Sequence, residues 1–196
     1  MPAIWFIGDT HFGHAKVSEI RGFADIDFHD LAIQRAWNRQ VKADDLVYIL
    51  GDISGGSRTG EAHALEILAN LPGRKVLISG NHDSVSSIHR KPSPHLEQFR
   101  NVFERIQDFA RIRIEGRDVL LSHYPYASSG DGPGRYGSRY EQYRLPDYGG
   151  LLVHAHTHHT DAFEGSYTGR EMCVSWDAWR RLVNLGDIAQ WVKTKF

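Results

Sequence analysis

Short apolar runs recur along the first half of the chain, and polar side chains follow each of them. The runs are Ile4–Ile7, Leu46–Leu50 and Val76–Ile78. Runs of this length, bounded by turn residues, are typical of buried strands. Apolar residues near helical spacing lie between them, at about 30–41 and about 59–69, where Thr59 is a candidate N-cap. This alternation predicts βαβ units and a largely parallel sheet.

The second half of the chain follows a different pattern. Residues 109–114 alternate apolar and polar positions, Gly116 allows a turn, and residues 118–121 form another short run. These features predict a hairpin in a second, mixed sheet, which the apolar run at 151–153 extends. A helix is expected at 187–192. Residues 124–150 are rich in Gly, Pro, Ser, Tyr and Arg, and loops of this length are usually lids or binding loops.

The length, net charge and cysteine count of the chain limit the classes of protein to which it can belong. With 196 residues the chain is expected to form one domain, residues 1–196, around a sizeable core. The formal net charge of −1 gives no basic footprint for strong nucleic-acid binding or for an anionic membrane. The single cysteine, Cys173, excludes an internal disulfide and fits a reducing compartment. The first residues resemble neither a signal peptide nor a membrane span, so a cytoplasmic protein is expected.

Metal-ligating side chains stand directly after the apolar runs, in five short motifs. The motifs are Asp9-Thr10-His11, Gly51-Asp52, Gly80-Asn81-His82-Asp83, Ser122-His123 and His156-Thr157-His158. Any one of them alone fits a turn or a helix cap. In open α/β sheets, however, ligands bind outside the carboxyl ends of the strands, where all five are expected. Together they predict one metal site and an enzyme.

The residue types of these motifs indicate which chemistry the site supports. Carboxylate and amide oxygens with imidazole nitrogens suit hard divalent metals such as Mn²⁺, Mg²⁺ or Fe, and the lack of thiolates argues against structural zinc. A carboxylate can be shared between two ions. Two ions about 3.5–4 Å apart can clamp the oxygens of a phosphoryl group. The sequence therefore predicts hydrolysis assisted by two metals.

The ordered set of motifs resembles the calcineurin-like metallophosphoesterase superfamily, whose pattern is D-x-H, G-D, G-N-H-[DE], a lone His and G-H-x-H. The match covers nearly the whole chain, and the opening Asp9-Thr10-His11-Phe12-Gly13-His14 is similar to small bacterial and phage members. The resemblance implies an α/β fold of two facing mixed β-sheets flanked by helices, a four-layer αββα sandwich. One position departs from the pattern: Ala155 stands where the family usually has Gly, and a requirement for positive φ there would displace the final His pair.

The resemblance also implies a role for each motif residue. Seven residues would be metal ligands: Asp9, His11 and His158 at the first ion, Asn81, His123 and His156 at the second, and Asp52 between them. His82 would contact the phosphate and protonate the leaving oxygen, and Asp83 would orient that imidazole. The cofactors would be two divalent ions, with Mn²⁺ favoured and Fe, Mg²⁺, Ni²⁺ or Zn²⁺ as alternatives.

The sequence indicates the residues that contact the substrate less specifically than it indicates the metal ligands. His14, Arg135, Tyr136, Arg139 and Tyr140 are candidates, because arginine suits phosphate and tyrosine stacks on a base. A solvated loop explains them equally well. A phosphodiesterase acting on small nucleotides, cyclic ones included, is favoured because no capping domain is evident. A phosphomonoesterase or protein phosphatase is the alternative; the balanced charge disfavours a nuclease, and the presence of His82 and every ligand disfavours a non-catalytic scaffold.

The remaining histidines and the tryptophans fit structural roles. His154 and His159 are expected to support the final ligand pair through hydrogen bonds rather than to ligate. Four further histidines are expected at the surface: His29, His63, His89 and His95. Three tryptophans are expected in the core: Trp5, Trp37 and Trp191. Cys173 is expected to be a buried, inert thiol.

Overall fold

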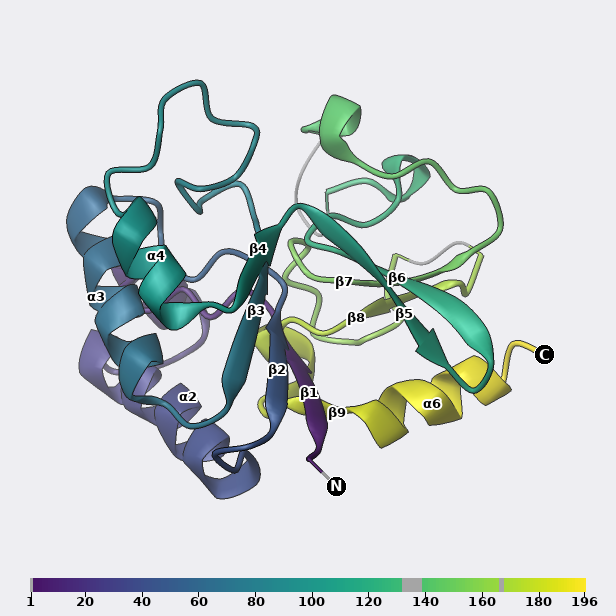
Figure 1. The fold of residues 1–196 in the computed structure, drawn as a ribbon, viewed down its shortest axis with the longest axis horizontal. Coiled ribbons are helices and arrows are strands. Elements are labelled where there is room, and N and C mark those ends of the chain that lie inside the picture. Colours follow the sequence, from purple (N-terminus) through teal and green to yellow (C-terminus); the bar gives the residue numbers. More distant parts are fainter. Residues whose placement is uncertain (1, 132–138, 166–167) are drawn as a thin grey trace.

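Two mixed β-sheets face each other in the computed structural model, which describes residues 2–131, 139–165 and 168–196 (Figure 1). The first sheet has the strand order β4-β3-β2-β1-β9. Its strands are β1 (Ile4–Ile7), β2 (Leu46–Ile49), β3 (Arg74–Ile78), β4 (Arg105–Gln107) and β9 (Val183–Asn184). Strands β1 to β4 are parallel to their neighbours, and β9 is antiparallel to β1. The predicted parallel strands are therefore confirmed, with their expected boundaries almost unchanged.

The second sheet has the order β5-β6-β7-β8. Its strands are β5 (Phe109–Ile114), β6 (Arg117–Ser122), β7 (Leu151–His154) and β8 (Glu171–Cys173). Strands β5 and β6 form the predicted antiparallel hairpin, with Phe109 opposite Ser122 and the turn at Gly116, whose φ is 74°. Strands β6, β7 and β8 are parallel to one another. The expectation of two facing mixed sheets is confirmed.

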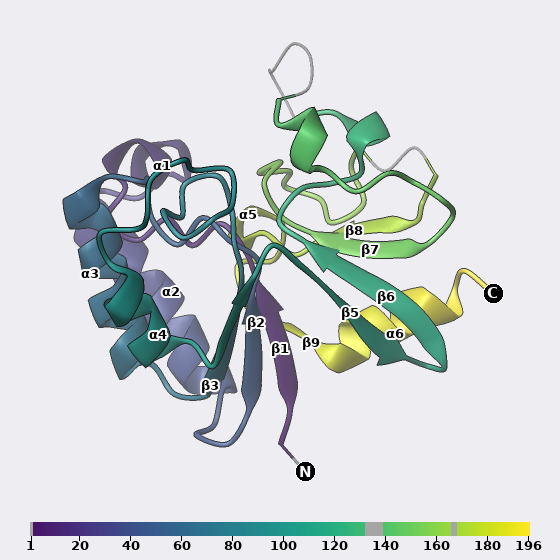
Figure 2. The ribbon, with the colours of Figure 1, turned by 45° about the horizontal axis from the view of Figure 1, so that its top comes forward.

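Helices α2 (Ile26–Gln40), α3 (Arg58–Asn70) and α4 (Leu96–Val102) cover the outer face of the first sheet (Figures 1 and 2). The other helices are α1 (Ala15–Ile20), α5 (Trp176–Trp179) and α6 (Leu185–Lys193), with 3₁₀ turns η1 (Ala127–Ser129) and η2 (Glu141–Tyr143), and α6 lies on the other side, alongside β5 and β6. Ile7 and Leu77 of the sheet pack in one buried cluster with Trp37 of α2, Leu68 of α3 and Phe99 of α4. This cluster fixes the helices over the sheet.

A second buried cluster lies between the two sheets. Phe6 and Val76 of the first sheet pack there with Leu121 and Val153 of the second. Strand β1 thus buries Phe6 between the sheets and the neighbouring Ile7 under the helices, which explains why its sequence is apolar throughout. Helix α6 contributes Trp191 and contacts strands of both sheets.

The outer face of the second sheet is covered by the segment that contains η1. The Glu171 carboxylate of β8 accepts a hydrogen bond of 2.6 Å from the Tyr126 backbone N–H and one from the Ser129 hydroxyl. Cys173, on the same face, is fully buried, as expected for an inert thiol. In the described part of the chain, short 3₁₀ turns and loop cover this face of β8.

Helix starts differ from those expected because of their capping residues. Asp25 accepts a hydrogen bond of 2.9 Å from the Phe28 N–H, so α2 begins at Ile26 rather than near residue 30. Ser57 caps α3 in place of Thr59, with its hydroxyl 3.1 Å from the Gly60 N–H. Trp37 and Trp191 are buried and Trp5 packs against the outer cluster, as expected. None of the described helices has the length and apolarity needed to span a membrane.

Candidate metal centre

The strand ends of both sheets bring the motif side chains together. Asp9 follows β1 and Asp52 follows β2, whereas His123 follows β6 and His156 and His158 follow β7. Two sets of three side chains result: Asp9, His11 and His158, and Asp52, His123 and His156. Within each set, one nitrogen or oxygen atom from every residue lies within 4.8 Å of the others. The arrangement has the character of two adjacent cation sites.

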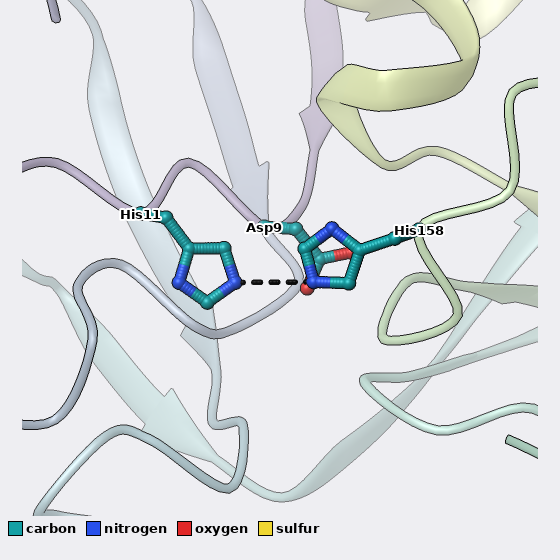
Figure 3. Close-up of side chains that lie close together, drawn as sticks. All are labelled: Asp9, His11 and His158. Carbon is teal, nitrogen blue, oxygen red and sulfur yellow. Dashed lines mark hydrogen bonds between the residues drawn. The ribbon is translucent and has the colours of Figure 1, made fainter. Parts of the chain in front are cut away.

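In the first set, the His11 and His158 rings face each other beside the Asp9 carboxylate (Figure 3). His11 Nε2 and His158 Nε2 lie 3.3 Å apart, and their rings stack with centroids 5.0 Å apart. The Asp9 carboxylate accepts a hydrogen bond of 2.8 Å from the His156 backbone N–H through Oδ2. Its other oxygen, Oδ1, is buried and has no hydrogen-bond partner. Burying a carboxylate oxygen in this way is costly unless a cation compensates it.

The second set includes a fourth donor, the Asn81 side chain. His123 Nε2 lies 3.2 Å from His156 Nδ1, 3.3 Å from Asn81 Oδ1 and 3.5 Å from Asp52 Oδ2. Ligand atoms about 2.1 Å from a shared ion lie roughly 3.0–3.4 Å apart in octahedral or tetrahedral geometry. The observed spacings therefore fit a common ion.

Asp52 belongs to the second set and also lies close to the first. Its Oδ2 is 3.5 Å from His123 Nε2 in one set and 3.9 Å from His11 Nε2 in the other. Its Oδ1 accepts a hydrogen bond of 2.8 Å from the His82 backbone N–H, which fixes the carboxylate plane. The position suits a carboxylate shared by two ions.

Each histidine of the centre is held through the ring nitrogen that faces away from it. His11 Nδ1 lies 2.9 Å from the Ser54 carbonyl oxygen, and His123 Nδ1 lies 2.7 Å from the Leu50 carbonyl oxygen. A carbonyl oxygen accepts only from N–H, so Nδ1 of both rings carries a proton, and Nε2 is the nitrogen left to bind a cation at the centre. His158 Nδ1 and His156 Nε2 are held by carboxylates instead, at 2.9 Å and 3.3 Å. All four imidazoles are thus oriented as ligands.

Electrostatics favour positive charge at the centre. Burial raises the pKa of Asp52, but the imidazoles of His123 and His11 lower it more, so the carboxylate is ionised. Burial lowers the pKa of His156 to about 4 and keeps this ring neutral. Burial also lowers the pKa of His123, yet the Asp52 carboxylate outweighs it and raises that pKa to about 9. Asp52 and His123 therefore favour a cation between them, whether a proton or a metal ion.

The backbone of the ligand loops is strained at the same residues. Five non-glycine residues of the two sets have positive φ: Asp9 (53°), His11 (46°), Asp52 (52°), His156 (70°) and His158 (54°). The left-handed conformation costs about 1–2 kcal/mol for residues other than glycine. Hydrogen bonds of 3.1 Å from Asp9 N to Gly51 O and from His11 N to Asp52 O hold two of these loops together. Such strain is concentrated at functional sites.

Close packing of the loops explains the small residues of the motifs. A Cβ atom on Gly80 would lie 2.3 Å from Asp52 Oδ1, so only glycine fits beside the shared carboxylate. A Cβ atom on Gly8 would likewise lie 2.3 Å from the Ala155 methyl group. Ala155 itself is not among the described residues with positive φ. The departure from the family pattern at this position therefore leaves the final His pair in place.

His82 lies at the edge of the centre, and its side chain is 42% exposed. Its Nε2 is 4.0 Å from Asp52 Oδ2. The expected contact between Asp83 and this imidazole is absent, and that prediction is wrong. The Asp83 carboxylate is fully buried and accepts backbone N–H groups of Gly80 (2.7 Å), Asp52 (3.0 Å) and Ile53 (3.0 Å). Burial, followed by the charge of Asp52, raises the pKa of Asp83 to about 7.

Asp177 and Arg21 support the centre, although the motifs did not indicate them. Asp177 Oδ2 accepts from His158 Nδ1 at 2.9 Å and from Arg21 Nη2 at 2.6 Å. Arg21 also donates to the Asp9 carbonyl oxygen at 2.7 Å. An aspartate shortly after the apolar residues 172–174 was the available signal.

His29 corrects a further expectation, because it is fully buried rather than at the surface. Its Nε2 lies 2.8 Å from Arg21 Nη1, and its Nδ1 lies 2.7 Å from Asp30 Oδ1. The early start of α2 places His29 in the helix, where it faces Arg21. His63, in contrast, has a side chain that is 48% exposed, as expected.

The other candidates surround the centre at different distances. His14 caps α1 by accepting from the Val17 N–H at 3.5 Å, and its ring centroid is 5.4 Å from that of His11. The Tyr140 ring centroid lies 6.1 Å from that of His156. Arg139 donates to Asp131 at 2.6 Å. Arg135 and Tyr136 lie outside the described residues.

The histidines that flank the final pair belong to neither set. His154 is buried, and its Nδ1 donates to the Ala155 carbonyl oxygen at 2.8 Å, as expected for a hydrogen-bonded structural residue. His159 is also buried.

Comparisons with known proteins identify the family to which the whole chain is similar. The family model of the calcineurin-like phosphoesterase superfamily domain matches residues 3–195. The gene 66 protein of Mycobacterium phage L5 is 41% identical over 96% of this chain and 93% of its own length. That of Mycobacterium phage D29 is 40% identical over 98% and 96%. The crystal structure of a protein of unknown function from Aquifex aeolicus superposes with a TM-score of 0.71 at 25% identity, covering 97% of this chain and 99% of that one.

Proposed function

Because the chain belongs to the calcineurin-like phosphoesterase superfamily, a family of metal-dependent phosphoester hydrolases, we propose that it is a phosphodiesterase acting on small nucleotide-type substrates, cyclic ones included. The observation that carries this proposal is the pair of three-residue sets that converge around Asp52. We further propose that residues 1–196 act as a single catalytic domain. The lone cysteine of the sequence supports a cytoplasmic setting.

The proposed ligands divide between two divalent ions. Asp9, His11 and His158 would hold the first, and Asn81, His123 and His156 the second, with Asp52 shared. When bound, the two ions would polarise water for attack on phosphorus and neutralise the phosphoryl oxygens. The oxygen and nitrogen donor set supports Mn²⁺ first, with Fe, Mg²⁺, Ni²⁺ or Zn²⁺ as alternatives.

His82 is proposed to act on the leaving group. Its side chain is partly exposed and its Nε2 lies 4.0 Å from Asp52 Oδ2, so a phosphoryl group at the centre would lie within its reach. Protonation of the departing oxygen by this imidazole would contribute roughly 10²- to 10⁴-fold to the rate. His14, whose ring packs near His11, is proposed to contact the same phosphoryl group.

Features on both sides of the centre favour a phosphodiester as the substrate. On one side His82 forms part of the wall of a cavity of about 350 Å³. On the other side the ring of Tyr140, a partly buried residue, lies near His156. We propose that this ring stacks on a nucleobase of the substrate. Arg139, bound to Asp131, would place its guanidinium 5.5 Å from the centre of that ring. A diester has two substituents to place, whereas a monoester has one.

The test is hydrolysis by metal-stripped protein to which Mn²⁺ is added back. We expect activity to return with the metal and to favour bis-p-nitrophenyl phosphate over p-nitrophenyl phosphate. A preference for the monoester would replace the diesterase proposal with a phosphomonoesterase or protein phosphatase. Activity on DNA that falls steeply with salt would favour a nuclease. Two bound ions without hydrolysis of any phosphoester would favour a non-catalytic scaffold.

A further inference from the structure

A cavity opens directly beside the centre, on the side of His82. Its volume is about 350 Å³, near the lower end of the roughly 300–1,000 Å³ of small-molecule sites. Its lining comes from the loop between β3 and α4, which includes Asn81 and His82, and from the start of α3 with the two glycines that precede it, Gly55 and Gly56. That loop and the first turn of α3 lie at the same end of the molecule (Figure 1). A group attached to the phosphoryl oxygen that His82 faces would therefore enter this cavity.

Two cations line the outer part of the cavity, Arg58 and Lys91. Both are exposed, and neither side chain makes a hydrogen bond or ion pair with any of the residues described. Arg58 is the first residue of α3, whose N-terminal end adds partial positive charge. Unpaired cations at the mouth of a cavity favour an anionic occupant.

The one acidic residue of the lining is already paired. Glu61 is 1% exposed, and its carboxylate accepts from the Ser84 backbone N–H at 2.7 Å and from the Ser84 hydroxyl at 2.5 Å. These bonds hold the loop against α3 and direct the Glu61 oxygens toward Ser84. Its charge therefore opposes an anion less than Arg58 and Lys91 attract one.

The lining lacks the surface that a nucleobase would need. Its ring-bearing side chains are His82, His89, Pro92 and Pro94, and His89 is held by a contact of 3.1 Å to the Asn81 carbonyl oxygen. Among the residues that the structure describes, no tyrosine, phenylalanine or tryptophan lines the cavity. A small charged group fits this lining better than an aromatic base does.

We propose that Arg58 and Lys91 bind a second anionic group, phosphate or its equivalent, on the leaving-group side of the substrate. This inference rests on the proposed function, because it takes His82 to mark the leaving group. The substrate class is then a phosphoester whose departing alcohol itself carries a phosphate. Specificity for that charge is separate from the hydrolytic step.

The test compares two diesters with leaving groups of similar acidity: methyl p-(phosphonomethyl)phenyl phosphate and methyl p-tolyl phosphate. With Mn²⁺ present, we expect wild-type kcat/KM to be roughly tenfold or more higher for the phosphonate-bearing ester, mainly through a lower KM. Arg58→Gln and Lys91→Gln should each reduce that preference, and the double variant should abolish it. All variants should hydrolyse the tolyl ester as wild type does.

Arg90→Gln is the matched control, because Arg90 is an exposed cation of the same loop that does not line the cavity. It should leave the preference unchanged. A double variant that keeps the wild-type preference, or a wild-type enzyme without one, would overturn the inference while hydrolysis of the tolyl ester still supported the proposed function. If neither diester is hydrolysed with metal bound, the proposed diesterase fails, and the inference with it.

Discussion

At the scale of single residues, the centre depends on side chains that are fixed before any ion binds. His11 and His123 are held by backbone carbonyl groups, and His158 is held by Asp177. Asp52 is fixed by the His82 backbone N–H. Fixing the ligands in this way lowers the entropy lost on metal binding and selects the ligating nitrogen.

His82 and the neighbouring Asp83 should respond differently to mutation. His82→Ala should retain its metal and its melting temperature, but kcat should fall roughly 10²- to 10⁴-fold, because the side chain is partly exposed and, among the described residues, makes only a 5.7 Å ring contact to His11 and a 4.0 Å approach to Asp52. Asp83→Ala should lose stability, because three buried N–H groups lose their acceptor, at about 1–3 kcal/mol for each unsatisfied group. Metal analysis, thermal unfolding and steady-state kinetics on both proteins distinguish the two roles. Full activity of His82→Ala would contradict the role given to this residue.

Asp177 is expected to act on metal affinity through His158. Asp177→Asn removes the charged acceptor of His158 Nδ1 and one partner of Arg21, so metal affinity should fall about 10- to 100-fold. Titration calorimetry with Mn²⁺ measures this change. Asp44→Asn, at an exposed position away from the centre, serves as control. An unchanged affinity in Asp177→Asn would show that His158 does not depend on this carboxylate.

The motif spacing predicted which side chains meet, but not what supports them. Asp9, Asp52 and Asn81 stand at strand ends, so their convergence follows from the sheet. The contact between His158 and Asp177 depends on the path of the chain between β7 and α5, which no local pattern encodes. For the same reason, burial of His29 against Arg21 was not predicted.

At the scale of elements, the longer strands were predictable, whereas the short strands β4, β8 and β9 and the helix starts were not. Strands β1 and β2 and the last three residues of β3 are buried on both faces, so these runs are continuously apolar and bounded by turn residues. The start of α2 depends on one hydrogen bond that Asp25 accepts from the Phe28 N–H, and that of α3 on one that Ser57 accepts from the Gly60 N–H. The cover of β8 by the η1 segment depends on contacts to Glu171 that are distant in sequence.

Strand β3 contains a buried lysine with a measurable effect on pH-dependent stability. Burial lowers the pKa of Lys75 from 10.5 to about 8, while its Nζ donates to the Leu71 and Gly73 carbonyl oxygens at 2.6 and 2.8 Å. The neutral amine still has two N–H groups for these two acceptors. Between about pH 8 and pH 10.5 the unfolded chain therefore binds more protons at Lys75 than the folded one, and stability rises with pH.

The prediction concerns the difference between wild type and Lys75→Met. The free energy of unfolding of wild type, relative to that of the variant, should increase by about 1–3 kcal/mol across this pH window. Urea unfolding at a series of pH values measures it, and subtracting the variant removes the contribution of other titrating groups. A difference that stays constant with pH would mean that Lys75 keeps its ordinary pKa in the folded protein.

At the scale of the whole molecule, the centre joins the two sheets. The loops of the first sheet provide Asp9, His11, Asp52 and Asn81, and those of the second provide His123, His156 and His158. Neither sheet alone holds a complete set, because each set contains residues from both. Metal binding should therefore stabilise the packing of one sheet on the other as well as the loops.

The packing of the two sheets against each other also explains why the metal centre lies outside the hydrophobic core. The core between the sheets is filled by side chains such as Phe6 and Leu121, so the ligand loops meet beyond the strand ends. The His82 cavity and the Tyr140 ring lie on either side of them. Placement of a diester across this opening follows from the arrangement of the sheets rather than from any single motif.

The central claim, a two-metal hydrolytic centre shared through Asp52, is tested most directly by measuring metal content and turnover together. Metal-stripped wild type should take up two Mn²⁺ ions per chain, and hydrolysis of bis-p-nitrophenyl phosphate should rise as the second ion binds. Asp52→Asn should lose at least one ion and nearly all turnover, because the amide cannot bridge as a carboxylate does. Unchanged metal content and activity in this variant would contradict the claim.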